Sequence, residues 1–407
     1  MQADAADLWK RHRGFVAAIV SAQVLTQIGA FTLAALLPGY IDRWGLSKTE
    51  AGWLVGIFFA AYVPAVPLLL ALTDRLPARR VYLVGTGLTA LSHLGFALAD
   101  GFWLGLVMRT LAGIGWAGAY MPGLKAIADT MEGSAQSRAV SWHAAGVGIA
   151  GAASFAVASL LDALAGPKAA FLFGALSATV AFCIAWNVLP RHMPKRSTTS
   201  TSGRFLDLRP VLRNRKVMAW IAGYTVHTWE MAALRGWAVT FLIAVSAQHG
   251  APNWLPSAPV LFTVAGLAGI AVSVTGNETA QRYGRTRVVT WAMVVAATLS
   301  VITGWTFAAP VVVAALAVLL WNAAIYLDSS ALTAGTVQAA EKHLRGATMG
   351  LHSMAGYAGG FLGPLGVGLA LDLGGQDSAL GWGLAFGHLA IVTLAGLLVV
   401  HILGRAP

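Results

Sequence analysis

The feature that most constrains this chain is the recurrence of apolar stretches, each about twenty residues long. Twelve such stretches follow one another along the 407 residues, separated by short polar loops. A helix of that length crosses the hydrocarbon core of a bilayer and satisfies its own backbone hydrogen bonds there. Charged residues make up only 11% of the chain, far below the roughly 25% of soluble domains. The sequence therefore predicts an all-α membrane protein that crosses the bilayer many times.

The apolar stretches form two groups of six. The first group comprises 15–40, 51–72, 81–99, 102–126, 139–161 and 169–189. The second group comprises 216–245, 257–275, 288–307, 310–337, 347–371 and 380–403. A polar stretch separates the groups. We therefore expect an N-terminal six-helix bundle over 1–190, a cytoplasmic linker over 191–215 and a C-terminal six-helix bundle over 216–407.

The distribution of positive charge predicts the orientation in the membrane. The loops and tails on one side carry 21 of the 27 Lys and Arg residues, whereas the opposite loops carry three. Cationic residues are retained on the cytoplasmic side during insertion. We therefore expect a multi-pass protein of the bacterial inner membrane with both termini in the cytoplasm. The same bias explains the net charge of +11, so we expect the lipid bilayer and no nucleic acid as a partner.

The two groups of spans share an internal repeat. An offset of 207 residues superposes the loop 74–81 on the loop 281–288, and both loops join the second and third spans of their group. At an offset of 210, Gly146 and Asp162 fall on Gly356 and Asp372. Matched sequence and matched topology indicate a duplication. Parallel six-span halves are a transporter architecture.

Short motifs in these loops and in the fourth span resemble those of the major facilitator superfamily of secondary transporters. The residues that carry the resemblance are Asp74, Arg75, Arg79, Arg80, Arg282, Gly284, Arg285, Arg109 and Gly113. Leu70, Pro77 and Ala78 depart from the loop pattern. The resemblance implies twelve transmembrane helices in two six-helix halves. It also implies that a small-molecule substrate binds between the halves, which rock to expose the site to each side in turn.

The resemblance further implies that the loops form a conformational latch. The Asp74 carboxylate can pair with arginines or meet the positive end of a helix, and such contacts break when the halves move. The predicted latch residues are Asp74, Arg75, Arg79, Arg80, Arg282 and Arg285. The alternative interpretation is that these arginines only anchor the cytoplasmic face.

Five ionisable residues lie well inside the apolar spans, namely Arg109, Lys125, Glu230, Arg235 and Asp328. Each can cost about 2.5–3.5 kcal/mol at the centre of a transmembrane helix, so a functional role is the simplest reason for their presence. The resemblance places the first, fourth, seventh and tenth spans around a central cavity. All five residues fall on the last three of these spans.

Helical geometry assigns roles to several polar residues. Arg109, Trp116 and Tyr120 share one stripe of the fourth span, and Gln23 and Gln27 share one face of the first. The predicted substrate-binding residues are Gln23, Gln27, Arg109, Trp116, Tyr120, Arg235 and Tyr326. The alternative for the glutamines is hydrogen bonding between helices. For Lys125, which lies near the cytoplasmic end of its span, the alternative is a side chain that extends to the interface.

Two carboxylates are the predicted proton-coupling residues. Glu230 lies about 21 Å along its helix from Lys216, and therefore near the middle of the bilayer. Asp328 is the second. On a regular helix it points about 160° away from Tyr326, so only one of these two side chains can face the cavity, and Tyr326 is the alternative cavity residue. The alternative role of Glu230 is a buried ion pair with a cation of the N-terminal half.

We expect a secondary active transporter that works by alternating access. The excess of buried cations over carboxylates favours proton-coupled uptake of a small organic anion, and the alternative is a proton-coupled exporter of amphipathic or cationic compounds. No motif of an enzyme is present, and a single cysteine, Cys183, excludes a cysteine metal cluster. We therefore expect no enzymatic activity, no cofactor and no metal, and a monomer.

Overall fold

The computed structural model describes residues 2–73, 75–191 and 208–404. Within these ranges the chain folds almost entirely into helices, and twelve helical segments are long and apolar enough to cross a membrane. The predicted all-α fold class with twelve spans is confirmed.

The helices follow one another without strands in the described ranges. They are α1 (Gln2–Gln27), α2 (Thr32–Trp44), α3 (Lys48–Leu72), α4 (Ala78–Leu98), α5 (Phe102–Thr130), α6 (Gly133–Ala165), α7 (Pro167–Val188), α8 (Arg209–Arg213), α9 (Arg215–His249), α10 (Ala258–Tyr283), α11 (Arg285–Trp305), α12 (Val311–Ala339), α13 (Arg345–Gly374) and α14 (Ala379–Gly404), with short 3₁₀ turns at Thr306–Ala308 and Lys342–Leu344. Contacts divide the chain into two compact units.

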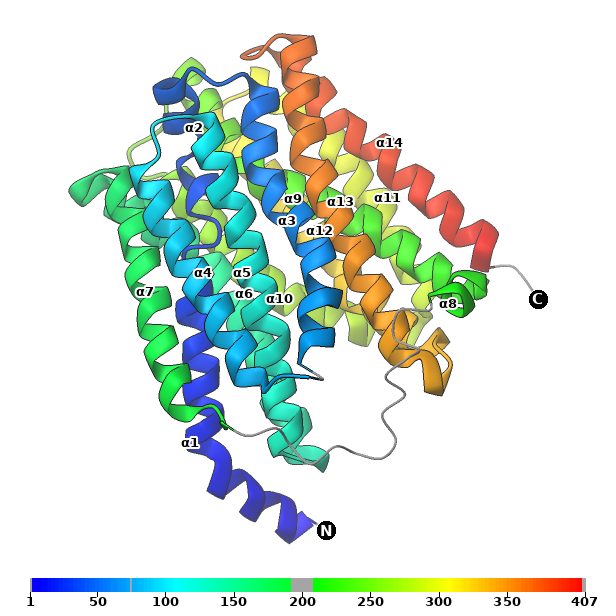
Figure 1. Ribbon diagram of the computed structural model, residues 1–407. Coiled ribbons are helices and arrows are strands. Elements are labelled where there is room, and N and C mark those ends of the chain that lie inside the picture. Colours follow the sequence, from blue (N-terminus) through cyan, green and yellow to red (C-terminus); the bar gives the residue numbers. More distant parts are fainter. Residues whose placement is uncertain (1, 74, 192–207, 405–407) are drawn as a thin grey trace. The chain divides into compact units, whose positions relative to one another are not determined.

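The first unit comprises residues 1–32 and 64–202. In it α4 packs against α5 and α7, and α1 packs against α6 and α7 (Figure 1). A Cβ atom on Gly85 of α4 would lie 2.4 Å from the carbonyl carbon of Gly118 of α5. Small residues such as these allow two transmembrane helices to approach closely.

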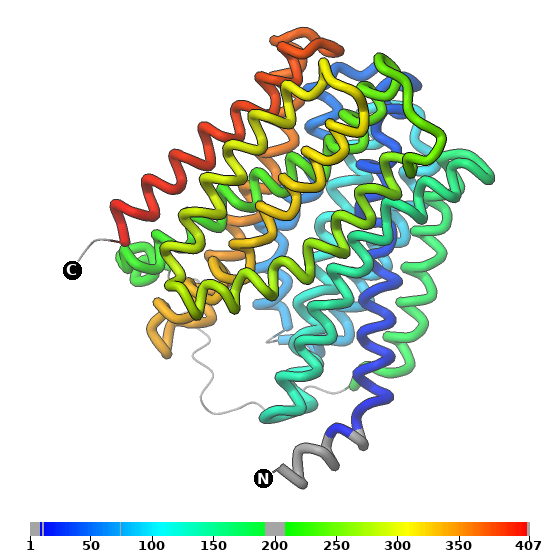
Figure 2. Tube along the Cα trace, turned by 180° about the vertical axis from the view of Figure 1, so that it is seen from behind, coloured from blue at the N-terminus to red at the C-terminus, as the bar shows by residue number. Residues whose placement is uncertain are grey.

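The second unit comprises residues 33–63 and 203–407. Here α9 contacts α12, α13 and α14, while α11 lies beside α14 (Figure 2). A Cβ atom on Gly363 of α13 would lie 2.1 Å from the carbonyl oxygen of Trp229. The boundary between the units passes through α3, so it differs from the six-helix division predicted from the repeat. That division stays a prediction.

The first predicted span, 15–40, is broken in its middle. The amides of Ala30 and Thr32 donate to the carbonyls of Gln27 and Gly29, which forms tight turns between α1 and α2. A Cβ atom on Gly29 would lie 2.7 Å from the His93 ring, so only glycine allows this approach. Discontinuous helices of this kind bring backbone polar groups to the interior of transporters.

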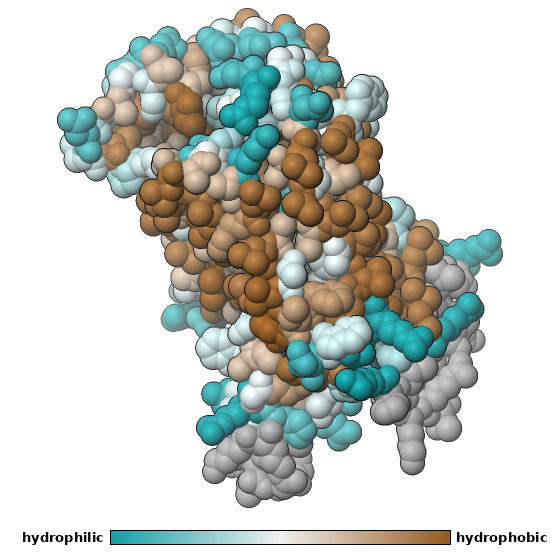
Figure 3. All heavy atoms as spheres, turned by 60° about the vertical axis from the view of Figure 1, so that its left-hand side comes forward, coloured by the Kyte–Doolittle hydropathy of each residue, from teal (hydrophilic) through white to brown (hydrophobic). Residues whose placement is uncertain are grey.

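The exterior of the protein is strongly apolar. Leu373 is 80% exposed, Trp103 is 76% exposed and Leu164 is 73% exposed. The face shown in Figure 3 has a broad apolar zone with hydrophilic side chains at both ends. Lipid is the solvent that such a surface requires, so the chain is a multi-pass membrane protein.

Candidate functional site

The most deeply buried carboxylate is that of Glu230, on α9 in the second unit. Its side chain is enclosed, with 3% of the residue exposed. Oε1 accepts a hydrogen bond from Nε1 of Trp321 at 2.6 Å, and Oε2 accepts one from Oγ1 of Thr393 at 3.1 Å. Both donors are neutral. The carboxylate therefore has two good hydrogen bonds but no opposite charge among its described neighbours.

A second carboxylate lies close to the first. Asp328, on α12, is also 3% exposed and interacts electrostatically with Glu230. Its Oδ1 lies 2.8 Å from Nδ1 of His227, which is on α9 three residues before Glu230. Nε2 of His227 is buried and has no hydrogen-bond partner within the described ranges. Two carboxylates and an imidazole thus form one buried cluster.

Aromatic stacking extends this cluster toward α13. The Tyr224 ring stacks on His227 at 5.8 Å and on His352 at 3.8 Å between ring centroids. Nδ1 of His352 lies 3.2 Å from the hydroxyl of Thr336. Polar and titratable side chains therefore follow one another from Thr336 through His352, Tyr224 and His227 to Asp328. We call Glu230, Asp328, His227, Tyr224 and His352 the polar cluster.

Arg235 and Tyr326 contact each other in the second unit. The guanidinium of Arg235 donates a hydrogen bond to the Tyr326 hydroxyl and lies 5.6 Å from the centroid of its ring. Tyr326 also packs against α10, because a Cβ atom on Gly269 would lie 2.7 Å from the ring. In the described structure Glu230 forms no ion pair with Arg235. Tyr326 and Asp328 thus have different partners, as the regular helix spacing implies.

In the first unit, Gln23 and Gln27 lie in the last two turns of α1 before the break. Gln23 is 0% exposed and Gln27 is 1% exposed. The side-chain nitrogen and oxygen of each amide are buried without a hydrogen-bond partner in the part of the chain that is described. Buried polar atoms are almost always satisfied, so a water molecule or a ligand is the expected partner.

Arg109 lies beside the break in the first span. It is 5% exposed, and its Nη1 donates to the Ala30 carbonyl at 3.4 Å. Trp116 packs edge-on against Phe31 with 6.4 Å between ring centroids. The cation and the aromatic ring of α5 thus both contact residues 28–31, although Tyr120 instead stacks on His143 at 5.4 Å.

Lys125 differs from the other intramembrane charges. Its Nζ lies 3.0 Å from Oδ2 of Asp129, one turn later on α5, and both side chains are more than a quarter exposed. The neighbouring Asp129 carboxylate therefore compensates the charge of Lys125. Of the other intramembrane charges, two arginines, Arg109 buried and Arg235 half-buried, remain against two buried carboxylates, which is less cationic than the sequence suggested.

The predicted latch residues are only partly described. Asp74 lies outside the described residues, and Arg75, Arg80 and Arg282 are exposed. Arg79 donates to the Trp186 carbonyl at 2.8 Å, and Arg285 donates to the Ala331 carbonyl at 2.7 Å. These bonds hold neighbouring helices together within each unit. The latch stays a prediction.

Several residues of the site were not expected from the sequence. Trp321 and Thr393 bind Glu230 but lie in spans where a tryptophan or a threonine is ordinarily a packing residue. The sequence signals for His227 are its three-residue spacing from Glu230 and its four-residue spacing from Met231, and both are weak. No group of three metal-binding side chains is found among the described residues.

A family model described as the Major Facilitator Superfamily matches residues 19–364. The chain belongs to this superfamily. The resemblance noted in the loop motifs is therefore confirmed, and the protein is a membrane transporter of this superfamily.

Curated relatives include two proteins named "Protein spinster homolog 1". The one from Xenopus laevis is 24% identical over 297 residues, which cover 68% of this chain and 56% of the relative. The one from Bos taurus is 25% identical over 273 residues, which cover 64% of this chain and 52% of the relative. The chain thus spans about half the length of these relatives.

Solved structures support the same fold. A bacterial homolog of the human lysosomal transporter Spinster, in an inward-facing and occupied conformation, has a TM-score of 0.80 at 15% identity and covers 97% of each chain. The D323A mutant of the nucleoside transporter NupG has a TM-score of 0.77 at 13% identity and covers 96% of this chain and all of its own. At these identities the likeness is one of fold.

Proposed function

We propose that this superfamily member is a proton-coupled secondary transporter that takes up a small organic anion. The observation that carries the proposal is the environment of Glu230, whose two hydrogen-bond partners are both neutral. A buried carboxylate without a compensating cation is costly in its charged form. It is therefore the kind of group that binds and releases a proton as its surroundings change.

The hydrogen bonds around Glu230 indicate where that proton would be. An indole N–H can only donate, so Oε1 accepts from Trp321 in either protonation state. A threonine hydroxyl can donate or accept, so Oε2 can carry the proton and then donate it to Thr393. The site accommodates both states without moving a helix.

The polar cluster offers the proton further positions. Asp328 and His227 lie 2.8 Å apart, so a proton on the imidazole would form an ion pair with the carboxylate. Because Asp328 also interacts with Glu230, a proton gained by one member changes the charge felt by the other. We propose Glu230 as the principal coupling residue and Asp328 as the second.

Substrate recognition is proposed for Gln23, Gln27 and Arg109 in the first unit. The unpartnered amides can hydrogen-bond a polar ligand, and the guanidinium can hold a carboxylate by two parallel hydrogen bonds. Trp116 supplies an apolar contact beside them. Arg235, with Tyr326, is the corresponding cation of the second unit.

A second candidate is the proton-coupled export of amphipathic or cationic compounds. The aromatic side chains of α5 favour it, because Trp116 and Tyr120 are rings of the kind to which a cation is attracted. The presence of two carboxylates beside the two intramembrane arginines also weakens the electrostatic case for an anion. The direction of transport therefore has to be measured.

The orientation and assembly are proposed from the sequence. We propose that the protein lies in a bacterial inner membrane as a monomer, with both termini in the cytoplasm. The excess of Lys and Arg in the loops on that side supports the orientation. We also retain the proposal that Asp74 and the loop arginines form a latch.

Two experiments test the proposed function. A thermal-shift screen of the purified protein against organic acids, inorganic anions and hydrophobic cations identifies the class of ligand, because a ligand that binds only the folded state stabilises it. Reconstitution into proteoliposomes with an imposed pH gradient then tests coupling. We expect uptake of the stabilising acid that a protonophore abolishes. Export of hydrophobic cations under the same gradient would favour the second candidate.

A further inference from the structure

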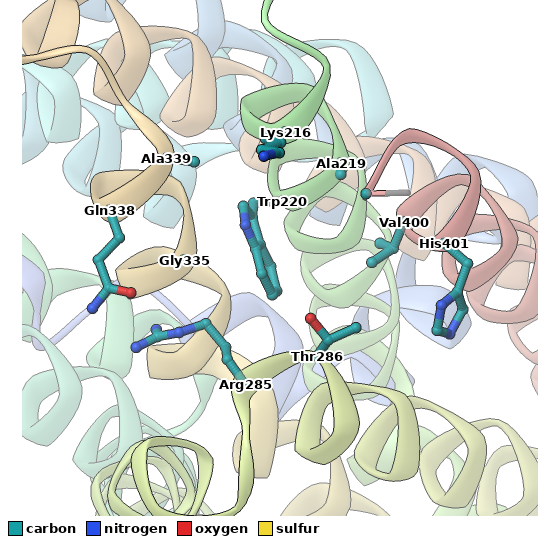
Figure 4. Close-up of a pocket in the computed structure, with 11 residues that line it drawn as sticks. Lys216, Ala219, Trp220, Arg285, Thr286, Gly335, Gln338, Ala339, Val400 and His401 are labelled. Carbon is teal, nitrogen blue, oxygen red and sulfur yellow. The ribbon is translucent and has the colours of Figure 1, made fainter. Parts of the chain in front are cut away.

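A cavity of about 550 Å³ opens at one end of the second unit, and none of its lining residues belongs to the polar cluster. It is enclosed by α9, α11, α12 and α14 (Figure 4). Trp220 stands between Lys216 and Arg285 in this view, and the polar ends of Arg285 and Gln338 point toward each other. We call it the basic cavity.

The charge of the basic cavity is positive. Lys216, Arg285 and His401 line it, and none of its eleven lining residues is Asp or Glu. Lys216 is exposed and forms no hydrogen bond or ion pair with the described residues. Arg285 has five N–H groups, and its bond to the Ala331 carbonyl uses one of them. The cavity therefore presents cationic donors without a bound counter-charge from its own walls.

The remaining wall of the basic cavity is apolar and well ordered by packing. Trp220 lies flat against α12, since a Cβ atom on Gly335 would be 2.6 Å from the indole ring. Val400 adds an aliphatic contact from α14. Tryptophan is enriched where a membrane protein meets the polar layer of the bilayer. An occupant with a charged head and an apolar part matches these walls.

Apolar surface lies on α14 beside His401, one of the lining residues. Leu398 is 61% exposed and Ile402 is 55% exposed, one turn apart on the outer face of α14, whereas Val400 faces the interior. An acyl chain can lie on such a surface while its headgroup occupies the cavity. Basic cavities between transmembrane helices on the cytoplasmic side are suited to anionic lipid headgroups.

We propose that the basic cavity binds the phosphate group of an anionic membrane phospholipid. Lys216 and Arg285 contact the phosphate oxygens, Gln338 and Thr286 hydrogen-bond the polar headgroup, and Trp220 packs against its glycerol end. In the orientation proposed above, this end of the unit lies in the cytoplasmic leaflet. This site is separate from the proposed transport site, so it can fail without affecting the proposed function.

Binding of defined lipids to purified, delipidated full-length protein tests the proposal. The probes are short-chain phosphatidylglycerol, short-chain phosphatidylcholine, glycerol 3-phosphate and inorganic phosphate, and the readouts are the Tm and the bound mass in native mass spectrometry. We expect phosphatidylglycerol to raise the Tm and to remain bound at concentrations where phosphatidylcholine does neither. Equal effects of the two lipids would overturn the assignment of an anionic headgroup.

Matched variants locate the effect in the cavity. Lys216→Gln and Arg285→Gln should each weaken binding of phosphatidylglycerol about tenfold, because each removes a charged hydrogen-bond donor. Arg215→Gln and Arg287→Gln remove the same charge from exposed neighbours that do not line the cavity, and they should bind as the wild type does. Lys216→Gln breaks no hydrogen bond of the described fold, so it remains informative if Arg285→Gln is unstable.

Two outcomes decide the source of the phosphate. If glycerol 3-phosphate or inorganic phosphate raises the Tm as much as phosphatidylglycerol, the ligand is a soluble phosphate and the lipid assignment is wrong. If Lys216→Gln and Arg215→Gln bind phosphatidylglycerol equally well, the lipid lies elsewhere on the protein and the site is wrong.

Discussion

The hydroxyl of Thr49 donates a hydrogen bond to the carboxylate of Asp372, with 2.6 Å between Oγ1 and Oδ2. The backbone amides of Thr49 and Lys48 donate to the same carboxylate at 2.8 and 3.1 Å. Asp372, at the end of α13, therefore caps the first turn of α3, where a negative charge also complements the helix dipole. By sequence, Thr49 belongs to the predicted N-terminal bundle and Asp372 to the C-terminal bundle. This contact joins them within the second unit.

We expect Asp372→Ala to favour states in which α3 separates from α13. Three hydrogen bonds from α3 to a charged acceptor are lost, together with one from Gln376 of the following turn, and a change of about 1.4 kcal/mol already alters the ratio of two states tenfold. Thr240→Cys is a suitable reporter, because Thr240 is 5% exposed and lines a cavity that Lys48 also lines. In a Cys183→Ser background, thiol labelling of this reporter should accelerate about tenfold.

The repeat supplies the control for this experiment. Asp162 on α6 is the counterpart of Asp372, and its side chain forms no hydrogen bond with the described residues. Asp162→Ala should therefore leave the labelling rate of the reporter unchanged. Similar acceleration in both variants would mean that loss of charge, and not loss of the cap, causes the effect.

Much of the fold followed from the sequence because hydropathy and charge act locally. Long apolar segments have few stable alternatives to helices in a bilayer, so the number of spans was predictable. The break between α1 and α2 was not, since it depends on the contact of Gly29 with His93, which is distant in the sequence. The packing of residues 33–63 with the second unit likewise depends on tertiary contacts such as that of Thr49 with Asp372.

Residues of the candidate site could be predicted from the sequence only where placing that residue type inside the membrane costs free energy whatever its neighbours are. Glu230 was identified because a carboxylate inside an apolar span is costly to insert and is therefore rarely present without a functional role. Its partners Trp321 and Thr393 did not, because neither residue is unusual in a transmembrane helix. The Lys125–Asp129 pair has ordinary four-residue helical spacing and was readable, but Asp129 lay beyond the predicted end of its span.

Arg109→Lys should weaken substrate binding while leaving insertion and folding intact. Lysine keeps the positive charge but loses the planar pair of donors that matches a carboxylate. We expect about a tenfold loss of affinity, measured as the concentration of organic acid that raises the Tm. Arg138→Lys, an exposed conservative change on α6, is the control. Unchanged affinity in Arg109→Ala would remove this residue from the binding site.

Glu230→Gln should abolish accumulation driven by a proton gradient and preserve exchange of substrate across the membrane. The amide oxygen can still accept from Trp321, and the amide nitrogen can donate to Thr393, so the packing is retained. Only the ability to bind and release a proton is lost. Paired accumulation and exchange assays in proteoliposomes make the distinction.

The control for this change is Glu278→Gln, which neutralises an exposed glutamate of α10. It should accumulate substrate as the wild type does. Full gradient-driven accumulation by a folded Glu230→Gln protein would transfer the coupling role to Asp328 or eliminate proton coupling. Loss of the folded protein would instead identify Glu230 as a structural residue.

The final prediction tests whether the hydroxyl group of Thr393, and not only the volume of its side chain, is required beside Glu230. Thr393→Val keeps the volume but removes the partner of Oε2 of Glu230, and an unsatisfied buried acceptor costs about 1–3 kcal/mol. The Tm should therefore fall, and gradient-driven accumulation should fall more than exchange. Thr393→Ser restores a hydroxyl and should recover both. Thr298→Val, which removes an exposed hydroxyl that bonds only its own helix, should change neither. If Thr393→Val accumulates substrate as well as Thr393→Ser does, the hydroxyl has no part in holding the proton, and the assignment of that proton to Oε2 is wrong.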